Sequence, residues 1–169
     1  MSSGRVEDDA IYAQIQELVP IACIDALPYR RSINRHEVCL IRRAVPAGGL
    51  GWTLIGGGVY RGETLGEALA RHLRGTLGPA VRWEEPDYDR PDAVGQYFPA
   101  RQGFPVDPRK HAIALTYLVE MTGQPVAEGE ADDFGWFDPD ALPQSNEVGF
   151  GQERVLGVLI SRLCRERQS

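Results

Sequence analysis

A run of glycines followed by a predicted helix constrains the fold of this chain more than any other feature. Gly56–Gly58 follow a short apolar segment, and leucines recur every fourth residue over Leu65–Leu77. This spacing places the leucines on one face of a helix, and Gly78-Pro79 is typical of a helix end. Glycines let the backbone approach a ligand closely, and N–H groups at a helix start attract phosphate oxygens. The segment therefore predicts a strand, a loop and a helix that together can hold a phosphate.

Further residues stand at a fixed spacing from these glycines. Gly57, Glu63, Arg71, Leu73 and Gly78 form the pattern G-x5-E-x7-R-x-U-x4-G, in which U is a bulky aliphatic residue. This pattern resembles the Nudix box, G-x5-E-x7-R-E-U-x-E-E-x-G-U, whose glutamates hold the divalent metals that cleave a diphosphate. The resemblance implies the Nudix fold and a site for pyrophosphate chemistry.

The box departs from the family pattern on its metal-binding side. His72, Gly75 and Thr76 stand where the family has glutamates. Mg²⁺ is usually bound by carboxylates, water and phosphate, so the metal-binding face is altered and the box is degenerate. We expect His72 to pack or to bond locally. Glu67 and Arg71 are spaced for an i, i+4 ion pair on the helix surface.

The rest of the chain predicts strands on both sides of this helix. A helix with the stripe Ile11, Ile15 and Leu18 is expected at 9–18, a basic turn at 28–34, and a turn with helix-start character at 138–142. A helix is also expected at 65–77 and another at 150–167. Strands are expected at 19–27, 37–43, 52–55, 112–120 and 134–137, with an interrupted strand in 83–99.

These elements predict an α+β fold, a Nudix-type α/β/α sandwich around a mixed β-sheet. Residues 1–169 are expected to form a single domain with its core at about 11–165.

Nearly the whole chain, from Ile11 to Leu163, resembles one Nudix branch, the GDP-mannose mannosyl hydrolases. That family cleaves a sugar C–O bond at the anomeric carbon, with one Mg²⁺ on the diphosphate leaving group. The resemblance therefore implies a nucleotide sugar as substrate. The similar segments are IACID (21–25), EVCLIRRAVPAGGLGWTLIGG (37–57), GGVYRGETLGEALARHLRGTLG (57–78), HAIALTYLVE (111–120) and EADDFGWFDPDAL (130–142).

Carried over residue by residue, the resemblance implies part of that family's site. Asp25 matches an aspartate near the sugar, and Arg43 matches an arginine that steadies the leaving diphosphate. Gly57 matches a glycine whose carbonyl helps to hold the metal. Thr76 replaces a metal-binding glutamate, and Ala131 replaces a histidine that serves as general base.

Two more positions complete the implied site. Gly58 replaces a phosphate-binding arginine, and Glu130 stands where a glutamine ligates the metal. We expect Mg²⁺ or Mn²⁺ as cofactor, held by Gly57, Glu130 and Glu67. The expected substrate-binding residues are Asp25, Arg43, Gly56, Gly57, Gly58 and Arg71.

Acidic residues cluster just before Phe134. The candidate catalytic residues are Glu130, Asp132 and Glu63, because Glu130 could ligate metal while a neighbour acts as base. A solvated acidic loop is the alternative for Glu128 to Asp133. Asp25 lies in an apolar segment, and an unpaired buried carboxylate is costly, so it needs Arg42, Arg43 or a ligand hydroxyl as partner.

Composition narrows the class of protein. The 169 residues carry a net charge of −6, which argues against a nucleic-acid-binding surface. The three cysteines form no C-x-x-C pair, so a structural zinc site is not expected. No secretory signal or apolar stretch long enough to span a bilayer stands out, so we expect a cytoplasmic protein. A homodimer is expected only because Nudix relatives often dimerise.

Three functions remain open from the sequence. The first is a Nudix-type hydrolase of a small nucleoside diphosphate derivative, with a nucleotide sugar as the first choice. The second is a catalytically inactive Nudix-fold module that binds such a ligand, favoured by the lost glutamates of the box. The third is an interaction protein with a vestigial pocket.

Overall fold

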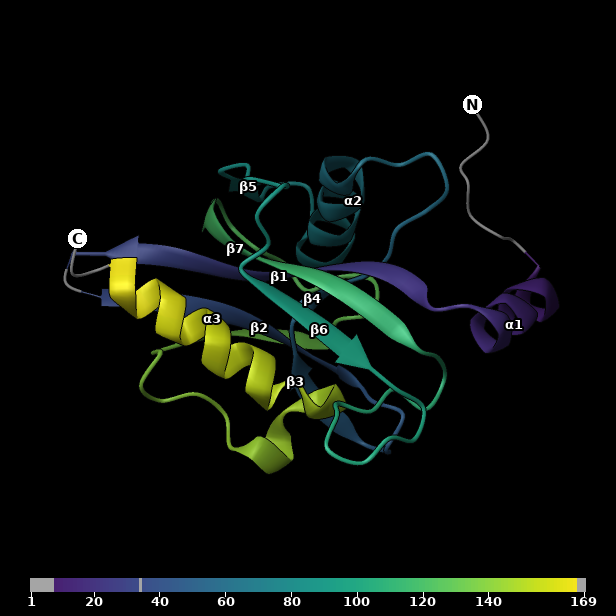
Figure 1. Cartoon of the computed structure of the whole chain (residues 1–169). Coiled ribbons are helices and arrows are strands. Elements are labelled where there is room, and N and C mark those ends of the chain that lie inside the picture. The colour runs from purple at the N-terminus through teal and green to yellow at the C-terminus, as the bar shows by residue number, and fades with distance from the viewer. Residues whose placement is uncertain (1–7, 34, 167–169) are drawn as a thin grey trace.

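The computed structural model describes residues 8–33 and 35–166 of the chain. A mixed sheet lies between helices α2 and α3, while α1 lies apart from this sandwich (Figure 1). No helix in these two ranges is both long and apolar enough to cross a membrane. The elements are α1 (Asp9–Leu18), β1 (Ile21–Ser32), β2 (Arg35–Ala44), β3 (Leu50–Thr53), β4 (Ile55–Gly58), α2 (Leu65–Leu77), β5 (Arg82–Trp83), β6 (Ala93–Tyr97), β7 (Ala112–Thr122), β8 (Asp133–Phe137), the 3-10 turns η1 (Ser145–Glu147) and η2 (Gly149–Gly151), and α3 (Glu153–Glu166).

Strand β1 is the centre of the sheet. It runs parallel to β7, from Ile21 opposite Ala112 to Tyr29 opposite Glu120. Its other edge is shared, because β4 pairs with the first half of β1 and β2 with its end, both antiparallel. β2 also pairs with β3 and β8, and β7 also pairs with β5 and β6. One parallel pair among antiparallel pairs confirms the predicted mixed sheet and the α+β fold class.

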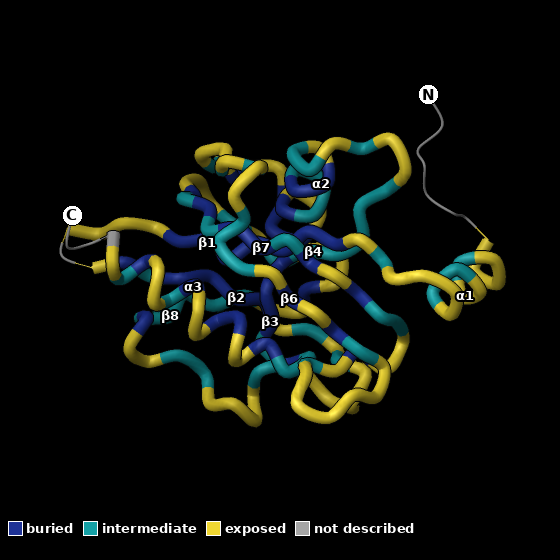
Figure 2. Tube along the Cα trace, in the orientation of Figure 1, coloured by how far each residue is buried: buried dark blue, intermediate teal, exposed yellow. Residues whose placement is uncertain are grey.

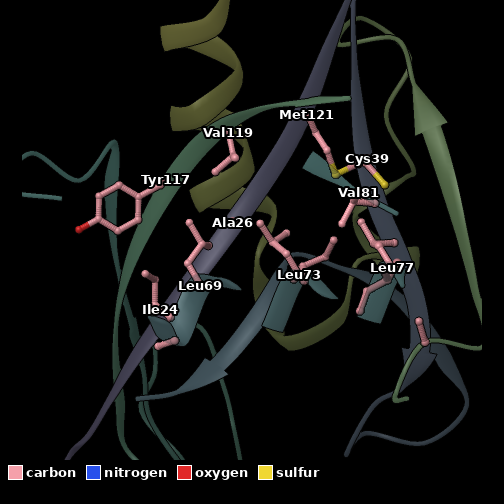
Figure 3. Close-up of a cluster of buried hydrophobic side chains, with 14 residues drawn as sticks. Ile24, Ala26, Cys39, Leu69, Leu73, Leu77, Val81, Tyr117, Val119 and Met121 are labelled. Carbon is pink, nitrogen blue, oxygen red and sulfur yellow. The ribbon is translucent and has the colours of Figure 1, made fainter. Parts of the chain in front are cut away.

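Two apolar clusters hold the helices on the sheet. The leucine stripe of α2 packs against β1 and β7 in one cluster that includes Tyr117, with Leu69 beside Ile24 and Leu73 beside Ala26 (Figure 3). On the other face, Leu156 and Leu159 of α3 belong to a second cluster with strands β1 and β2. In Figure 2 the buried residues follow the sheet and the inner faces of these two helices, whereas α1 has no buried residue over Asp9–Leu18.

Side-chain caps explain where the first two helices begin. The carboxylate of Asp8 accepts hydrogen bonds from the N–H groups of Ala10 and Ile11. Thr64 and Glu67 form a reciprocal capping box at the start of α2. Gly78 ends α2 with φ of 81°, a conformation that favours glycine. The predicted limits of these helices, 9–18 and 65–77, are confirmed.

The basic turn predicted at 28–34 is wrong for most of its length. β1 continues to Ser32 and pairs with β2 up to Arg35. Arg30 is held on this strand because its guanidinium lies 4.2 Å from the ring centre of Trp136 and 2.8 Å from Glu37. Residue 34 lies outside the described residues.

Two other segments also differ from their predicted limits. The strand predicted at 52–55 is two strands, since the chain leaves β2 after Thr53 and joins β1 at Ile55. Gln152 stabilises the change of partner by accepting a hydrogen bond from the N–H of Leu54 at 2.9 Å. No α-helix begins at 138–142, where a single turn is found.

The C-terminal helix starts later than predicted, at Glu153. Phe150 has φ of 56°, which is incompatible with a helix, and it lies within the 3-10 turn η2. The predicted end at residue 167 lies outside the described residues.

Candidate functional site

The glycine strand β4 lies directly against β1. Asp25 pairs with Gly56 and Ile24 with Gly57. A side chain at Gly56 would overlap the carbonyl of Ile24 and the carboxylate of Asp25, and one at Gly57 would meet the His72 ring at 2.8 Å. Glycine is therefore required at both positions by close approach, and the same approach brings Asp25 beside the predicted phosphate loop.

Glu63 and Arg71 brace the loop that follows. Arg71 donates from Nε and Nη2 to the two carboxylate oxygens of Glu63, at 2.7 and 2.8 Å. Its Nη2 also donates to the carbonyl of Gly58, and Glu63 accepts from the N–H of Tyr60. The hydrogen bonds from Arg71 lower the pKa of Glu63. Both residues were predicted as site residues, and in the structure they fix the loop.

The predicted ion pair between Glu67 and Arg71 is replaced by other contacts. The Glu67 carboxylate accepts from the backbone N–H and the hydroxyl of Thr64, at 2.8 and 3.0 Å. These bonds lower its pKa. Glu67 is not among the described residues that line the Asp25 pocket, and its contacts explain the helix start.

Two of the three altered positions of the box, His72 and Thr76, are packed, whereas Gly75 is exposed. His72 lies over the glycine strand, with Nε2 3.1 Å from the carbonyl of Gly58. Its pKa is lowered by burial, so the ring is neutral at pH 7. Thr76 is 3% exposed, and its carbonyl accepts a hydrogen bond from the N–H of Glu128. The expectation that His72 bonds locally is confirmed.

A small pocket opens beside Asp25. It has a volume of about 60 Å³. Asp25 is 8% exposed, and burial raises its pKa to about 7, with Glu130 adding to the rise while Lys110 and Arg43 oppose it. Such a carboxyl exchanges protons near neutral pH. The lining residues are Cys23, Asp25, Arg43, Thr53, Leu54, Gly56, Gly57, Tyr97, Asp107, Arg109, Lys110, Ala112, Ala114, Phe150 and Gln152.

Three cationic side chains share this pocket. Arg43 forms an ion pair with Glu130 at 2.6 Å, and its buried Nε has no hydrogen-bond partner among the described residues. Arg109 is held by two bonds of 2.9 Å to the carboxylate of Asp107. The third cation is Lys110. Positive charge and an unpaired donor at one place favour an anionic ligand.

Two of these cations lie against the ring of Phe150. Their guanidinium carbons lie 5.6 Å (Arg43) and 5.3 Å (Arg109) from its ring centre. The left-handed backbone of Phe150 turns the ring into the pocket wall. The sequence reasoning missed Arg109, Lys110 and Phe150, although the run Asp107-Pro108-Arg109-Lys110 before a strand was a usable signal.

The acidic side chains of the loop 128–133 do not form one cluster in the structure. Glu130 reaches Arg43, whereas Asp132 is exposed and Asp133 begins β8. Glu128 lies beside Gly78 at the end of α2. Over residues 8–33 and 35–166, no group of three or more His, Cys, Asp or Glu side chains could hold a metal ion.

The mixed sheet, the glycine strand and the braced loop-helix define the Nudix hydrolase fold, which solved structures share. The chain is similar, at 28% identity and a TM-score of 0.80, to a possible asymmetric diadenosine tetraphosphate (Ap4A) hydrolase from Jonesia denitrificans, over 88% of this chain and 97% of that one. A MutT Nudix hydrolase from Burkholderia pseudomallei matches at 24% identity, with a TM-score of 0.63, over 83% and 98%.

The Nudix domain of Shewanella oneidensis NrtR, solved with ADP ribose, matches at 16% identity with a TM-score of 0.59, over 92% of this chain and 99% of that one. The chain belongs to the family described as Domain of unknown function (DUF4916), whose model matches residues 2–160. The comparison with curated proteins gives no match.

Proposed function

We propose that this protein hydrolyses a nucleoside diphosphate derivative at the Asp25 pocket, with a nucleotide sugar as the first choice. One observation carries the proposal. The buried carboxyl of Asp25 lies among Arg43, Arg109 and Lys110, next to the glycine strand of a Nudix fold. A proton-exchanging acid beside several phosphate-binding cations can supply both general base catalysis and charge stabilisation for diphosphate cleavage.

The cations bind the diphosphate. Guanidinium groups match phosphate oxygens in a bidentate way, and Arg43 has an unpaired Nε with which to do so. The Thr53 hydroxyl, which finds no partner in the described residues, is a further donor in the same wall. Gly56–Gly58 let the ligand approach the backbone, and Arg71 keeps that backbone in place through its bond to the Gly58 carbonyl.

Asp25 moves the proton. With a pKa of about 7, it accepts a proton from the attacking water while the bond to the leaving phosphate or diphosphate breaks. It then gives the proton to that leaving group or to solvent. Glu130 and its neighbour Asp132 are the second choice for this role. The attack is directed either at phosphorus or at the anomeric carbon of the sugar, and the two give different products.

The pocket residues are better suited to a divalent metal that binds together with the substrate than to one that is bound before the substrate arrives. Mg²⁺ is often held by one or two carboxylates together with substrate phosphates and water. Glu130 and the carbonyl of Gly57 would hold such an ion, while Glu67 serves the helix cap. When bound, Mg²⁺ or Mn²⁺ neutralises the charge that develops on the leaving diphosphate.

A non-catalytic binding module is the second candidate function. It is favoured by one observation: at two of the positions where the box has lost its glutamates, His72 is bonded to Gly58 and Thr76 is buried. Such a module would keep the cationic pocket and bind the ligand without turnover.

Turnover of a broad panel of nucleoside diphosphate derivatives tests the proposal. Wild type with Mg²⁺ or Mn²⁺ is compared with Asp25→Asn and with the control Asp140→Asn, an exposed aspartate outside the pocket. We expect Asp25→Asn to lower kcat by about 10²–10⁴-fold, the usual worth of a general base, and the control to leave it unchanged. Saturable binding without product in wild type would support the binding module instead.

A further inference from the structure

A larger cleft lies between α1 and the glycine strand. Its volume is about 480 Å³, against about 60 Å³ for the Asp25 pocket. Sites for small molecules usually measure about 300–1,000 Å³, so the Asp25 pocket holds only a small group of a nucleotide. The cleft is large enough for the rest of the nucleotide. Its lining residues are Asp9, Tyr12, Ile15, Pro20, Ile21, Ala22, Gly58, Val59, Tyr60, Arg61, Arg71 and His72.

Two tyrosines from different elements line this cleft. Tyr60 follows the glycine strand, and the Arg71 guanidinium lies 3.7 Å from its ring centre. Because Glu63 holds Arg71, the Tyr60 ring is backed by a fixed support. Tyr12 comes from α1 and places its hydroxyl 3.9 Å from where a side chain of Gly58 would begin. Aromatic rings presented in this way can stack on a flat heterocycle.

The cleft and the phosphate site lie next to each other along the glycine strand. Gly58 lines the cleft, while Gly56 and Gly57 line the Asp25 pocket. Tyr12 also interacts electrostatically with Arg109 of that pocket. One ligand can therefore lie along the glycine strand, with its flat end in the cleft and its diphosphate near the cations.

We propose that this cleft binds the nucleoside of the substrate, with the base held by Tyr12 and Tyr60. The inference rests on the proposed function and adds two residues that bind the ligand. The proposal also gives helix α1 a function, which is to form part of the ligand site. None of its residues Asp9–Leu18 is buried, so it contributes a wall to the cleft rather than side chains to the core.

Another cavity is large enough for comparison but less suited to a base. It measures about 310 Å³ and lies beside β3 and η2. Phe150 is the only aromatic ring among its described lining residues, and both Arg43 and Arg109 already lie against that ring. This leaves the base no second aromatic wall.

Binding of two probes to the full chain tests the inference. Inorganic pyrophosphate reports the cationic pocket, and methylene-bridged analogues of ADP and GDP, which resist hydrolysis, report the pocket and the cleft together. Calorimetry with Mg²⁺ compares wild type, Tyr12→Ala, Tyr60→Ala and Tyr12→Phe. Ile11→Ala is the matched control, because Ile11 is exposed on the same helix and does not line the cleft.

We expect at least one nucleotide analogue to bind more tightly than pyrophosphate. Tyr12→Ala and Tyr60→Ala should each weaken its binding by about 10-fold or more, as loss of one base-stacking ring does, and leave pyrophosphate affinity unchanged. Tyr12→Phe and Ile11→Ala should behave like wild type. Since α1 has no buried residue, the Tyr12 variants should keep the melting temperature of wild type.

The outcomes separate the two proposals. If pyrophosphate binds but both nucleosides add no affinity, or if the alanine variants bind the analogues as wild type does, the cleft proposal is overturned and the anion pocket stands. Equal weakening of pyrophosphate and the analogues also overturns it, because the tyrosines would then act on the phosphate site. If neither probe binds, both the cleft proposal and the proposed function fail.

Discussion

Arg71 and Glu63 are joined through two hydrogen bonds, Nε to Oε1 at 2.7 Å and Nη2 to Oε2 at 2.8 Å. Glu63 lies on the segment that leads from the glycine strand into α2, and Arg71 lies within α2. Their side chains are 31% and 19% exposed, so the pair is only partly screened by water. The geometry indicates that this pair holds the loop in shape whether or not the protein is catalytic.

A double-mutant cycle measures the pair. Glu63→Gln and Arg71→Lys should each lower the free energy of unfolding by about 1–2 kcal/mol, since each breaks the fork of charge-assisted bonds. The double variant should cost about 1 kcal/mol less than the sum of the single changes. Urea denaturation gives all four values, and strict additivity would contradict the coupling.

Gly75 is a glycine that the fold does not require. It lies within α2, and an added Cβ would meet nothing within 4 Å in the described part of the chain. Gly75→Ala should therefore raise the free energy of unfolding by about 0.5–1 kcal/mol, the difference in helix propensity. Gly56→Ala is the matched contrast, because its Cβ would collide with β1. Thermal melting should move in opposite directions for the two variants.

The helices were predictable because local signals agree with the packing. Leu69, Leu73 and Leu77 lie one turn apart and all three are buried, and Thr64 and Gly78 mark the helix ends. The first hairpin was less predictable, because the chain alone does not show that Arg30 lies over Trp136, far away in sequence. Because of such long-range contacts, most of the segment predicted as a basic turn is part of strand β1.

The Asp25 carboxyl should make stability depend on pH. Its pKa is about 7 in the folded protein against an ordinary value of 3.8, chiefly because it is buried. Between these values the folded state binds more protons than the unfolded state, so this group lowers stability as pH rises from about 4 to about 7. Stability from this source is greatest at low pH and lost above pH 7.

Asp25→Asn removes this dependence. The free energy of unfolding of the variant minus that of wild type should increase by on the order of 3 kcal/mol between pH 5 and pH 8. Chemical denaturation at the two pH values gives the difference. A gap that stays constant with pH would show that Asp25 does not titrate in this range.

Glu130 forms an ion pair with Arg43 at 2.6 Å, so part of the Arg43 guanidinium is not available to a ligand. Without metal, Glu130→Gln should strengthen pyrophosphate binding by about 3–10-fold, because it releases Arg43 and removes a negative charge. Glu84→Gln is the control, since Glu84 is exposed and outside the pocket. With Mg²⁺ present, Glu130→Gln should lower turnover, because Glu130 is the carboxylate proposed to hold the metal. Unchanged or weaker metal-free binding would contradict this arrangement.

The candidate site was predictable only in part. Gly57 was predicted from the box pattern, and Asp25 and Arg43 from the resemblance to the GDP-mannose mannosyl hydrolases; all three line one pocket. Arg109 was missed because it lies in a polar loop whose position depends on β7 pairing with β1. Tyr12 was missed because a tyrosine on a helix predicts no ligand until the helix is seen beside the glycine strand.

Phosphorus NMR of the protein with Mg²⁺ or Mn²⁺ and a set of nucleotide sugars tests the central claim most directly. The account predicts new phosphorus signals that depend on Asp25. A nucleoside diphosphate product would mean cleavage of the sugar C–O bond, and a nucleoside monophosphate with a sugar phosphate would mean attack on phosphorus. No new signal for any nucleotide sugar or other nucleoside diphosphate derivative after long incubation would contradict hydrolysis and favour the non-catalytic binding module.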